Sequence, residues 1–201
     1  MINFKDSQTK INLARTFAGE CQAGARYQFI AQKAIAENKK NIQMLFKNLA
    51  KNEMSHAKKV WQLLSKYGDE IQENIEIKAG FPFEDGDLVE MIKFASNNEK
   101  SEATNIYPSF SKIAEDEGFK DIAETFKLIA KVENEHFMLI DSLYNKLKAN
   151  ALFKSPIPQQ WKCSMCGHTE TSKEGFRTCP LCDETCNSIE LNFLMNSSNQ
   201  N

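Results

Sequence analysis

Apolar residues recur at spacings of three and four over residues 6–150, which is the period of an amphipathic α-helix rather than of a strand. Short polar or glycine-containing breaks divide this region into four predicted helices. The predicted helices cover roughly residues 6–37, 41–67, 87–117 and 119–149. Pro108 lies inside the third one, where it should kink the helix or start a new segment. We therefore expect an all-α four-helix bundle, as a domain that covers residues 1–150.

The apolar stripe of the second and of the fourth helix is interrupted at mid-length by a Glu-x-x-His pair. The second helix carries Glu53 and His56, and the fourth carries Glu133 and His136 eighty positions later, inside a matching apolar frame. The flanking stripe positions are Ile42, Phe46, Leu49, Val60 and Leu63 in the second helix and Ile122, Phe126, Ile129, Ile140 and Leu143 in the fourth. Such matched frames indicate a duplicated helix hairpin.

Carboxylates also interrupt the stripes of the first and third helices. Glu20 lies in the first, and Glu99 and Glu102 lie in the third. When Glu20 is aligned with Glu99, the position that matches Glu102 is Ala23, so one half of the duplication has an extra carboxylate. If the two hairpins pack together, all four polar interruptions meet at one level of the bundle.

Five carboxylates and two imidazoles inside a bundle are not tolerated as uncompensated groups, because charge in a low-dielectric interior is costly. Two divalent ions would bring the carboxylate charge from −5 to −1, and two trivalent ions would bring it to +1, which leaves room for an oxo or hydroxo bridge. Mixed carboxylate and imidazole ligation suits iron or manganese. The alternative is a set of surface charges and satisfied core histidines. The chain has only 3 histidines, so two of them in matching frames argue against that alternative.

Composition changes after the bundle. Residues 151–160 contain Pro156 and Pro158, which predict a semi-stiff extended linker that could reach about 30 Å. From residue 161 to about 194 the chain is rich in Cys, Gly and Thr, and we expect a small separate domain there. Residues 195–201 are polar and are predicted to be a disordered tail.

Two Cys-x-x-Cys knuckles lie in the small domain and predict a tetrahedral tetrathiolate metal site. The four predicted ligands are Cys163, Cys166, Cys179 and Cys182. A zinc ribbon fits this spacing too, but zinc carries no electrons, and the redox-type site upstream favours iron. Cys186 falls outside both knuckles, Cys21 is expected to be a packing residue, and His168 is expected to be a loop residue.

Charge and targeting signals narrow the class of partner. The formal net charge is −2 and no stretch is strongly basic, which argues against nucleic acid or an anionic membrane as partner. The beginning of the sequence has no secretory pattern, and no segment approaches the roughly 18 apolar residues of a membrane span, so we expect a cytoplasmic protein. In a reducing compartment, the crowding of cysteines favours metal over disulfides.

These motifs together resemble the rubrerythrin family, from near the N-terminus to about residue 194. The motifs are Phe17-Ala-Gly-Glu20 with Tyr27, Glu53-x-x-His56, Glu99-x-x-Glu102 followed by Tyr107-Pro108, Glu133-x-x-His136, and the two cysteine knuckles with Trp161. The resemblance implies a ferritin-like diiron domain fused to a rubredoxin-like Fe(Cys)4 domain, acting as a peroxidase that reduces hydrogen peroxide to water in oxidative-stress defence. The implied iron ligands are Glu20, Glu53, His56, Glu99, Glu102, Glu133 and His136.

The resemblance also implies that Glu102 and His56 exchange as ligands of one iron when the oxidation state changes. Glu102, His56, Tyr27 and Tyr107 are our candidate catalytic residues. The hydroxyls of Tyr27 and Tyr107 could hydrogen-bond ligand carboxylates, and a plain packing role is the alternative for both. The two carboxylates of the Glu-x-x-His pairs are expected to bridge the ions.

The Fe(Cys)4 centre is expected to return electrons one at a time, with a reductase or a rubredoxin passing them on from NAD(P)H. The resemblance suggests a head-to-tail homodimer, or a larger assembly, in which the centre of one chain serves the diiron site of the other. Zinc or manganese could replace iron. Two alternatives from other classes are a ferritin-like ferroxidase that handles iron and a one-electron carrier with a purely structural helical site.

Overall fold

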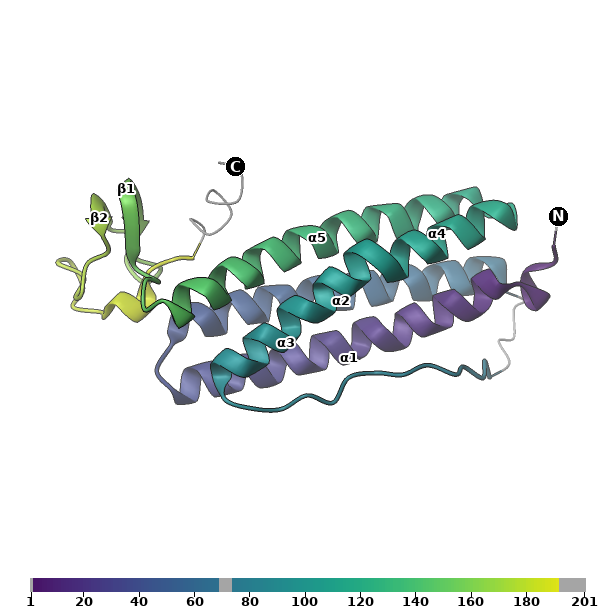
Figure 1. Ribbon diagram of the computed structural model, residues 1–201, viewed down its shortest axis with the longest axis horizontal. Coiled ribbons are helices and arrows are strands. Elements are labelled where there is room, and N and C mark those ends of the chain that lie inside the picture. The colour runs from purple at the N-terminus through teal and green to yellow at the C-terminus, as the bar shows by residue number, and fades with distance from the viewer. Residues whose placement is uncertain (1, 69–73, 192–201) are drawn as a thin grey trace.

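The computed structural model describes residues 2–68 and 74–191 and shows four long helical stretches side by side, with a small domain at one end (Figure 1). The helices are α1 (Gln8–Ala36), α2 (Lys40–Tyr67), α3 (Leu88–Ser101), a π-helical segment (Glu102–Ile106), α4 (Tyr107–Asp116) and α5 (Lys120–Lys148). The strands are β1 (Lys154–Lys162) and β2 (Thr169–Glu174), and short 3-10 turns cover Phe4–Asp6 and Cys186–Ser188. The predicted tail at 195–201 lies outside the described residues. The all-α bundle with a small C-terminal domain is confirmed.

The third predicted helix consists of three consecutive parts. α3 passes into the π-helical segment without leaving helical backbone angles, and α4 follows directly. Pro108 stands in the first turn of α4, where its missing N–H would have had no helical partner in any case. The proline therefore begins a new segment, which is one of the two outcomes that the sequence allowed.

Capping residues fix where the helices begin. Ser7 accepts a hydrogen bond from the Lys10 N–H at the start of α1. α3 begins with a capping box, in which Asp87 and Glu90 each accept from the backbone N–H of the other. Gly118 has φ 94° in the turn between α4 and α5, a conformation that glycine adopts without strain.

The apolar stripes are buried, and the polar level divides the bundle core into two clusters. One lies toward the small domain and includes Tyr27, Phe46, Ile92, Ile140 and Leu143. The other lies toward the chain start and includes Leu13, Val60, Leu63, Ile122 and Phe126. The polar site is thus enclosed by packed core on both sides along the bundle axis.

The predicted linker over residues 151–160 is wrong for its second part, because β1 begins at Lys154 and pairs with β2. The antiparallel register is regular from Gln159 onward and is shifted between Lys154 and Gln159. Pro156 and Pro158 stand inside this irregular stretch, where no ladder N–H is required of them. Only residues 149–153 connect α5 to the strand.

The small domain packs against the end of the bundle where α1 turns into α2 and where α5 ends (Figure 1). Trp161 is fully buried and its Nε1–H donates to the Ser172 carbonyl at 3.1 Å. The Lys40 ammonium, at the start of α2, lies 2.8 Å from both carboxylate oxygens of Glu184. The small domain is therefore docked on its own bundle.

No helix in the described ranges is long and apolar enough to cross a membrane.

Candidate metal centres

Side chains from four helices converge at the polar level of the bundle. Two groups of ligand atoms form there, and within each group all atoms lie within 4.8 Å of one another. The first group is Glu20, Glu53, His56 and Glu133, and the second is Glu53, Glu99, Glu133 and His136. The glutamates of the two Glu-x-x-His pairs belong to both groups, which is the geometry of two ions that share two carboxylates.

Both imidazoles turn their Nδ1 atoms toward the shared carboxylates. His56 Nδ1 lies 2.9 Å from Glu133 Oε1 and 3.4 Å from Glu20 Oε2. His136 Nδ1 lies 2.8 Å from Glu133 Oε2 and 3.0 Å from Glu53 Oε1. The i, i+3 spacing in α2 and α5 thus places each histidine on the same face as its glutamate.

Burial leaves these atoms without ordinary hydrogen-bond partners. The unpartnered buried atoms at this level are Glu20 Oε2, both oxygens of Glu53, Glu99 Oε2, both oxygens of Glu133, and Nδ1 of His56 and His136. Unsatisfied buried polar atoms are rare in folded proteins and call for an explanation such as a bound ion. All of them are hard or borderline donors of the kind that iron or manganese binds, so the donor set fits a pair of such ions.

The electrostatics of the site point to the same conclusion. Burial raises the pKa of Glu20 and of Glu99 well above the usual range. Burial also disfavours charge on Glu53, but the adjacent imidazoles of His136 and His56 outweigh it and lower its pKa to about 2. Burial opposes a charged imidazole at His136, but contacts with Glu133, Glu53 and Glu99 raise its pKa to about 12. Without a metal the carboxylates thus need positive charge from protons, which bound cations would replace.

Glu102 does not join either group. It begins the π-helical segment, is half-buried, and lines a cavity on the outer side of the site. Burial and then the negative charge of Glu20 raise the pKa of its carboxyl, while the Arg26 guanidinium lowers it. His56 occupies a ligand position in the first group in its place. The predicted exchange of Glu102 with His56 stays a prediction. In this structure the His56 imidazole belongs to the first ligand group and the Glu102 carboxylate does not.

Two buried tyrosines make reciprocal contacts across the halves of the bundle. The Tyr27 hydroxyl, on α1, donates to Glu99 Oε1 on α3, and the Tyr107 hydroxyl, on α4, donates to Glu20 Oε1 on α1. Each tyrosine therefore orients the carboxylate that is specific to one ligand group. The expected contacts with predicted ligands are present, and a catalytic role for the tyrosines stays a prediction.

Asn52 is a contact that the sequence did not reveal. Its side-chain amide lies 3.3 Å from His136 Nε2, the ring nitrogen that faces away from the cluster. With Nδ1 turned to the cluster, Nε2 carries the proton, and the amide can turn its oxygen toward it as acceptor. The equivalent position on α5 is Val132, so the duplication gave no signal for this residue.

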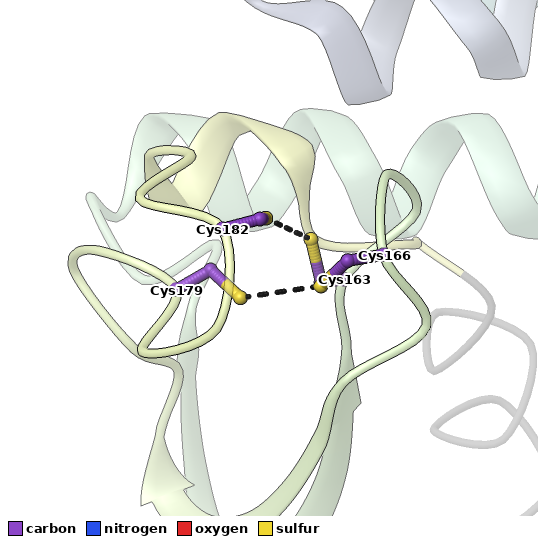
Figure 2. Close-up of side chains that lie close together, drawn as sticks. All are labelled: Cys163, Cys166, Cys179 and Cys182. Carbon is purple, nitrogen blue, oxygen red and sulfur yellow. Dashed lines mark hydrogen bonds between the residues drawn. The ribbon is translucent and has the colours of Figure 1, made fainter.

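The four predicted cysteines converge in the small domain (Figure 2). The Sγ atoms of Cys163 and Cys182 are 3.7 Å apart, and those of Cys166 and Cys179 are 3.6 Å apart. No disulfide involves any of the six cysteines, all of which belong to the described part of the chain. Burial raises the pKa of Cys179, but backbone N–H groups of the knuckle outweigh it and lower the pKa to about 7, which favours the thiolate that binds metals.

The two knuckle loops share one backbone design. Gly167 N donates to the Cys163 carbonyl at 2.9 Å, and Asp183 N donates to the Cys179 carbonyl at 3.0 Å. Both Gly167 and Asp183 have positive φ, 77° and 61°. Each loop therefore curls around its pair of sulfur atoms in the same way, as a tetrathiolate site requires.

The remaining two cysteines and His168 lie outside the four-cysteine group. Cys186 starts a 3-10 turn, Cys21 is half-buried on α1, and the His168 ring packs 6.1 Å from the ring of Phe176.

Sequence comparison identifies the family. The rubrerythrin family profile matches residues 12–152. The chain belongs to the rubrerythrin family. It is 39% identical over 183 residues to rubrerythrin-1 of Clostridium acetobutylicum and 36% identical over 184 residues to the rubrerythrin of Clostridium perfringens, covering 90% of this chain and 93% of each relative. The carboxylate–histidine groups and the four cysteines fit the diiron and Fe(Cys)4 centres of a rubrerythrin, an oxidoreductase of oxidative-stress defence.

Solved structures show the same fold. Nigerythrin in a mixed-valence state matches with a TM-score of 0.60 at 23% identity and covers 94% of this chain and 92% of that one. Its fully reduced, all-ferrous state matches with the same TM-score and covers 93% of that chain. A bacterioferritin from Desulfovibrio desulfuricans matches with a TM-score of 0.51 at 17% identity over 72% of this chain. The long matches span the bundle and the small domain together.

Proposed function

We propose that this rubrerythrin is a cytoplasmic peroxidase that reduces hydrogen peroxide to water at a diiron site in the bundle, with electrons relayed through an Fe(Cys)4 centre. The proposed diiron ligands are Glu20, Glu53, His56, Glu99, Glu102, Glu133 and His136, and the proposed Fe(Cys)4 ligands are Cys163, Cys166, Cys179 and Cys182. The observation that carries the proposal is the pair of ligand groups that share two carboxylates, with eight of their buried atoms left without a hydrogen-bond partner.

A ferrous pair would supply two electrons together and polarise the bound peroxide. The protein's part is to hold and orient the ligands. Glu53 and Glu133 lie in both groups, and we propose that these two carboxylates would be shared by the ions. Tyr27 and Tyr107 fix the orientation of Glu99 and Glu20 through their hydroxyls.

Ligand exchange is confined to the cavity side of the site. Glu102 is half-buried at the start of the π-helical segment, and His56 stands in the first ligand group. A carboxylate at the edge of a cavity can move toward or away from the site without disturbing packed core. We therefore assign the redox-linked exchange to Glu102 and His56, as the resemblance implies.

Electron transfer weakens steeply with distance, which bears on the route from the small domain. Lys40 contacts the small domain at one end of α2, and Glu53 lies thirteen residues further along that helix, or about 20 Å at 1.5 Å per residue. This separation favours a head-to-tail homodimer in which the Fe(Cys)4 centre of one chain serves the diiron site of its partner. A reductase or a rubredoxin would recharge that centre with electrons from NAD(P)H.

Mixing two inactive variants tests the cross-chain route. Cys179→Ala chains lack the electron-entry site, and Glu53→Ala chains lack a shared diiron ligand. Mixed dimers should recover part of the NAD(P)H-driven peroxidase activity. If mixing restores nothing although both variants form dimers, the cross-chain route is wrong.

Rapid mixing of the fully reduced, iron-loaded protein with hydrogen peroxide tests the peroxidase itself. We expect both iron centres to oxidise, with the diiron site first, and we expect a slower reaction in Glu102→Ala. Glu135→Gln is a matched control, because Glu135 lies on α5 beside a ligand but is exposed. A parent protein that oxidises no faster than the Glu102→Ala variant would refute the proposal.

A further inference from the structure

A cavity of about 540 Å³ lies beside the proposed diiron site. One wall is α1, a second is the extended segment of residues 78–82, which runs along the bundle, and a third is formed by the π-helical segment and the start of α4 (Figure 1). Glu102 and Tyr107 both line this cavity, and the Tyr107 hydroxyl donates to Glu20 of the first ligand group. The cavity therefore ends at the wall of the site on the side where ligand exchange is proposed.

The lining of this cavity combines apolar side chains with polar and charged ones, the latter including Arg15 and Glu102. Phe81, Ile106 and Phe110 contribute apolar surface, and Phe81 Cε1 lies 3.8 Å from where a side chain at Gly19 would begin. Because Gly19 has no side chain, the space beside it on α1 belongs to the cavity, and the Phe81 ring borders that space. The surroundings suit a ligand with a hydrocarbon or aromatic body.

Arg15 lines the same cavity and carries a donor without a partner. One of its guanidinium nitrogens, Nη2, donates to the Lys78 carbonyl at 2.7 Å, which fixes the side chain against the extended segment. Its Nε–H is buried and has no hydrogen-bond partner among the described residues. A buried donor of a charged group that lacks a partner favours an anionic acceptor such as a carboxylate.

Hydrogen peroxide is far smaller than this space, whereas cavities of roughly 300–1,000 Å³ are typical of sites for larger organic ligands. We propose that the cavity admits organic hydroperoxides, that it prefers those carrying a carboxylate, and that Arg15 is the specificity-determining residue. This inference rests on the proposed peroxidase function and names a substrate class for it. The reaction is ROOH + 2e⁻ + 2H⁺ → ROH + H₂O: the O–O bond breaks, each oxygen takes a proton, and the two ferrous ions supply the electrons.

The spacing along α1 defines the length of the substrate. Arg15 precedes Glu20 by five residues, which is about 7.5 Å along the helix axis. A carboxylate and a hydroperoxide on opposite ends of one benzene ring span a comparable distance. The probe is therefore 4-(2-hydroperoxypropan-2-yl)benzoate, and cumene hydroperoxide, which lacks only the carboxylate, is its matched neutral counterpart.

The kinetic test compares three oxidants on the reduced, iron-loaded protein by rapid mixing. We expect the carboxylated hydroperoxide to oxidise the diiron site at least about tenfold faster than cumene hydroperoxide, which corresponds to one charge-assisted hydrogen bond. In Arg15→Gln this preference should fall to about one, and in Lys51→Gln, which removes an exposed positive charge from α2, it should persist.

Gly19→Leu provides a second, independent variant. Leucine favours the helix more than glycine does, and its side chain would fill the cavity. The rates with both organic hydroperoxides, each divided by the rate with hydrogen peroxide, should fall at least about tenfold, because only the larger substrates need the space.

A binding measurement gives a readout that does not depend on turnover. The alcohol product, 4-(2-hydroxypropan-2-yl)benzoate, is titrated into the oxidised, iron-loaded protein by calorimetry, and we expect binding that Arg15→Gln weakens and Gly19→Leu abolishes. If hydrogen peroxide oxidises the site but neither organic hydroperoxide does, this inference is overturned and the proposed function stands. If the two organic hydroperoxides react equally, the role of Arg15 is overturned. If no oxidant reacts, the proposed function itself fails.

Discussion

Iron binding should stabilise the bundle, and the structure predicts how each ligand contributes. Without ions, eight buried ligand atoms at the polar level have no hydrogen-bond partner, so ions that bind the folded chain satisfy groups that the unfolded chain leaves to water. A ligand at a free concentration of 100 times its Kd stabilises the folded state by about 2.7 kcal/mol, so two such ions contribute about 5 kcal/mol. At about 2–4 °C per kcal/mol for a chain of this size, the melting temperature should rise by about 10–20 °C.

The sharing of carboxylates makes the prediction specific. Glu53 belongs to both ligand groups, whereas Glu20 belongs only to the first and Glu99 only to the second. Glu53→Gln should therefore lose most of the stabilisation by iron, and Glu20→Gln and Glu99→Gln should each lose about half. Glu135→Gln should keep all of it, because Glu135 is exposed on the same helix as two ligands.

The assay is thermal unfolding under anaerobic conditions, with and without Fe²⁺, followed by circular dichroism at 222 nm. That signal reports the bundle, since the small domain contains only two short strands and one 3-10 turn among the described residues. If Glu53→Gln and Glu135→Gln lost the stabilisation by iron equally, the assignment of the site to two ligand groups would be refuted. The same would follow if iron left the melting temperature of the parent protein unchanged.

Three further predictions concern residues that are not themselves members of the ligand groups. Glu117 accepts from the N–H groups of Gln8 and Thr9 at 2.9 Å, and although burial opposes its charge, these bonds and the Thr9 hydroxyl lower its pKa. Glu117→Ala should therefore lower the free energy of unfolding by about 1 kcal/mol at pH 7, measured by denaturant titration. The difference between variant and parent should vanish as the pH falls through the lowered pKa, because only the ionised carboxylate is stabilising. Gly175→Ala places a methyl group 2.8 Å from Ile189 Cδ1 and should destabilise the small domain by about 1–3 kcal/mol, seen as earlier thermal loss of its metal–thiolate absorbance. Asn52→Leu removes the partner of the outer nitrogen of a ligand histidine and should lower iron affinity about 10–100-fold in an equilibrium titration.

The features that the sequence predicted well are those set by local periodicity. The stripe residues Phe46 and Phe126 are fully buried, and the polar interruptions Glu53 and Glu133 meet between two core clusters, as the matched frames required. A helical repeat determines which face a residue occupies, so residues on inward faces at one level of a bundle must converge. The cysteine knuckles were predictable for a similar reason, since their loops are closed by local backbone hydrogen bonds.

The features that the sequence did not reveal depend on partners far apart in the chain. Pro156 and Pro158 read as linker residues, and only the pairing of β1 with β2 makes that segment a strand. The contact of Lys40 with Glu184 joins residues 144 positions apart, and nothing in either local pattern indicates it. The reciprocal hydrogen bonds of the two tyrosines are likewise properties of the assembled bundle.

The π-helical segment gives the extra carboxylate a physical role. In a regular α-helix, Glu99 and Glu102 would lie on one face, three residues apart, and both would point at the ions. The structure instead places Glu102 at the start of a π-helical segment, a feature that is frequent at functional sites, and its carboxylate lies at the cavity edge, outside both ligand groups. The equivalent position in the other half is Ala23, which is buried and offers no ligand. His136 therefore has no carboxylate with which to exchange, and the proposed exchange is restricted to the ion held by Glu20 and His56, beside the cavity through which we propose that the substrate enters.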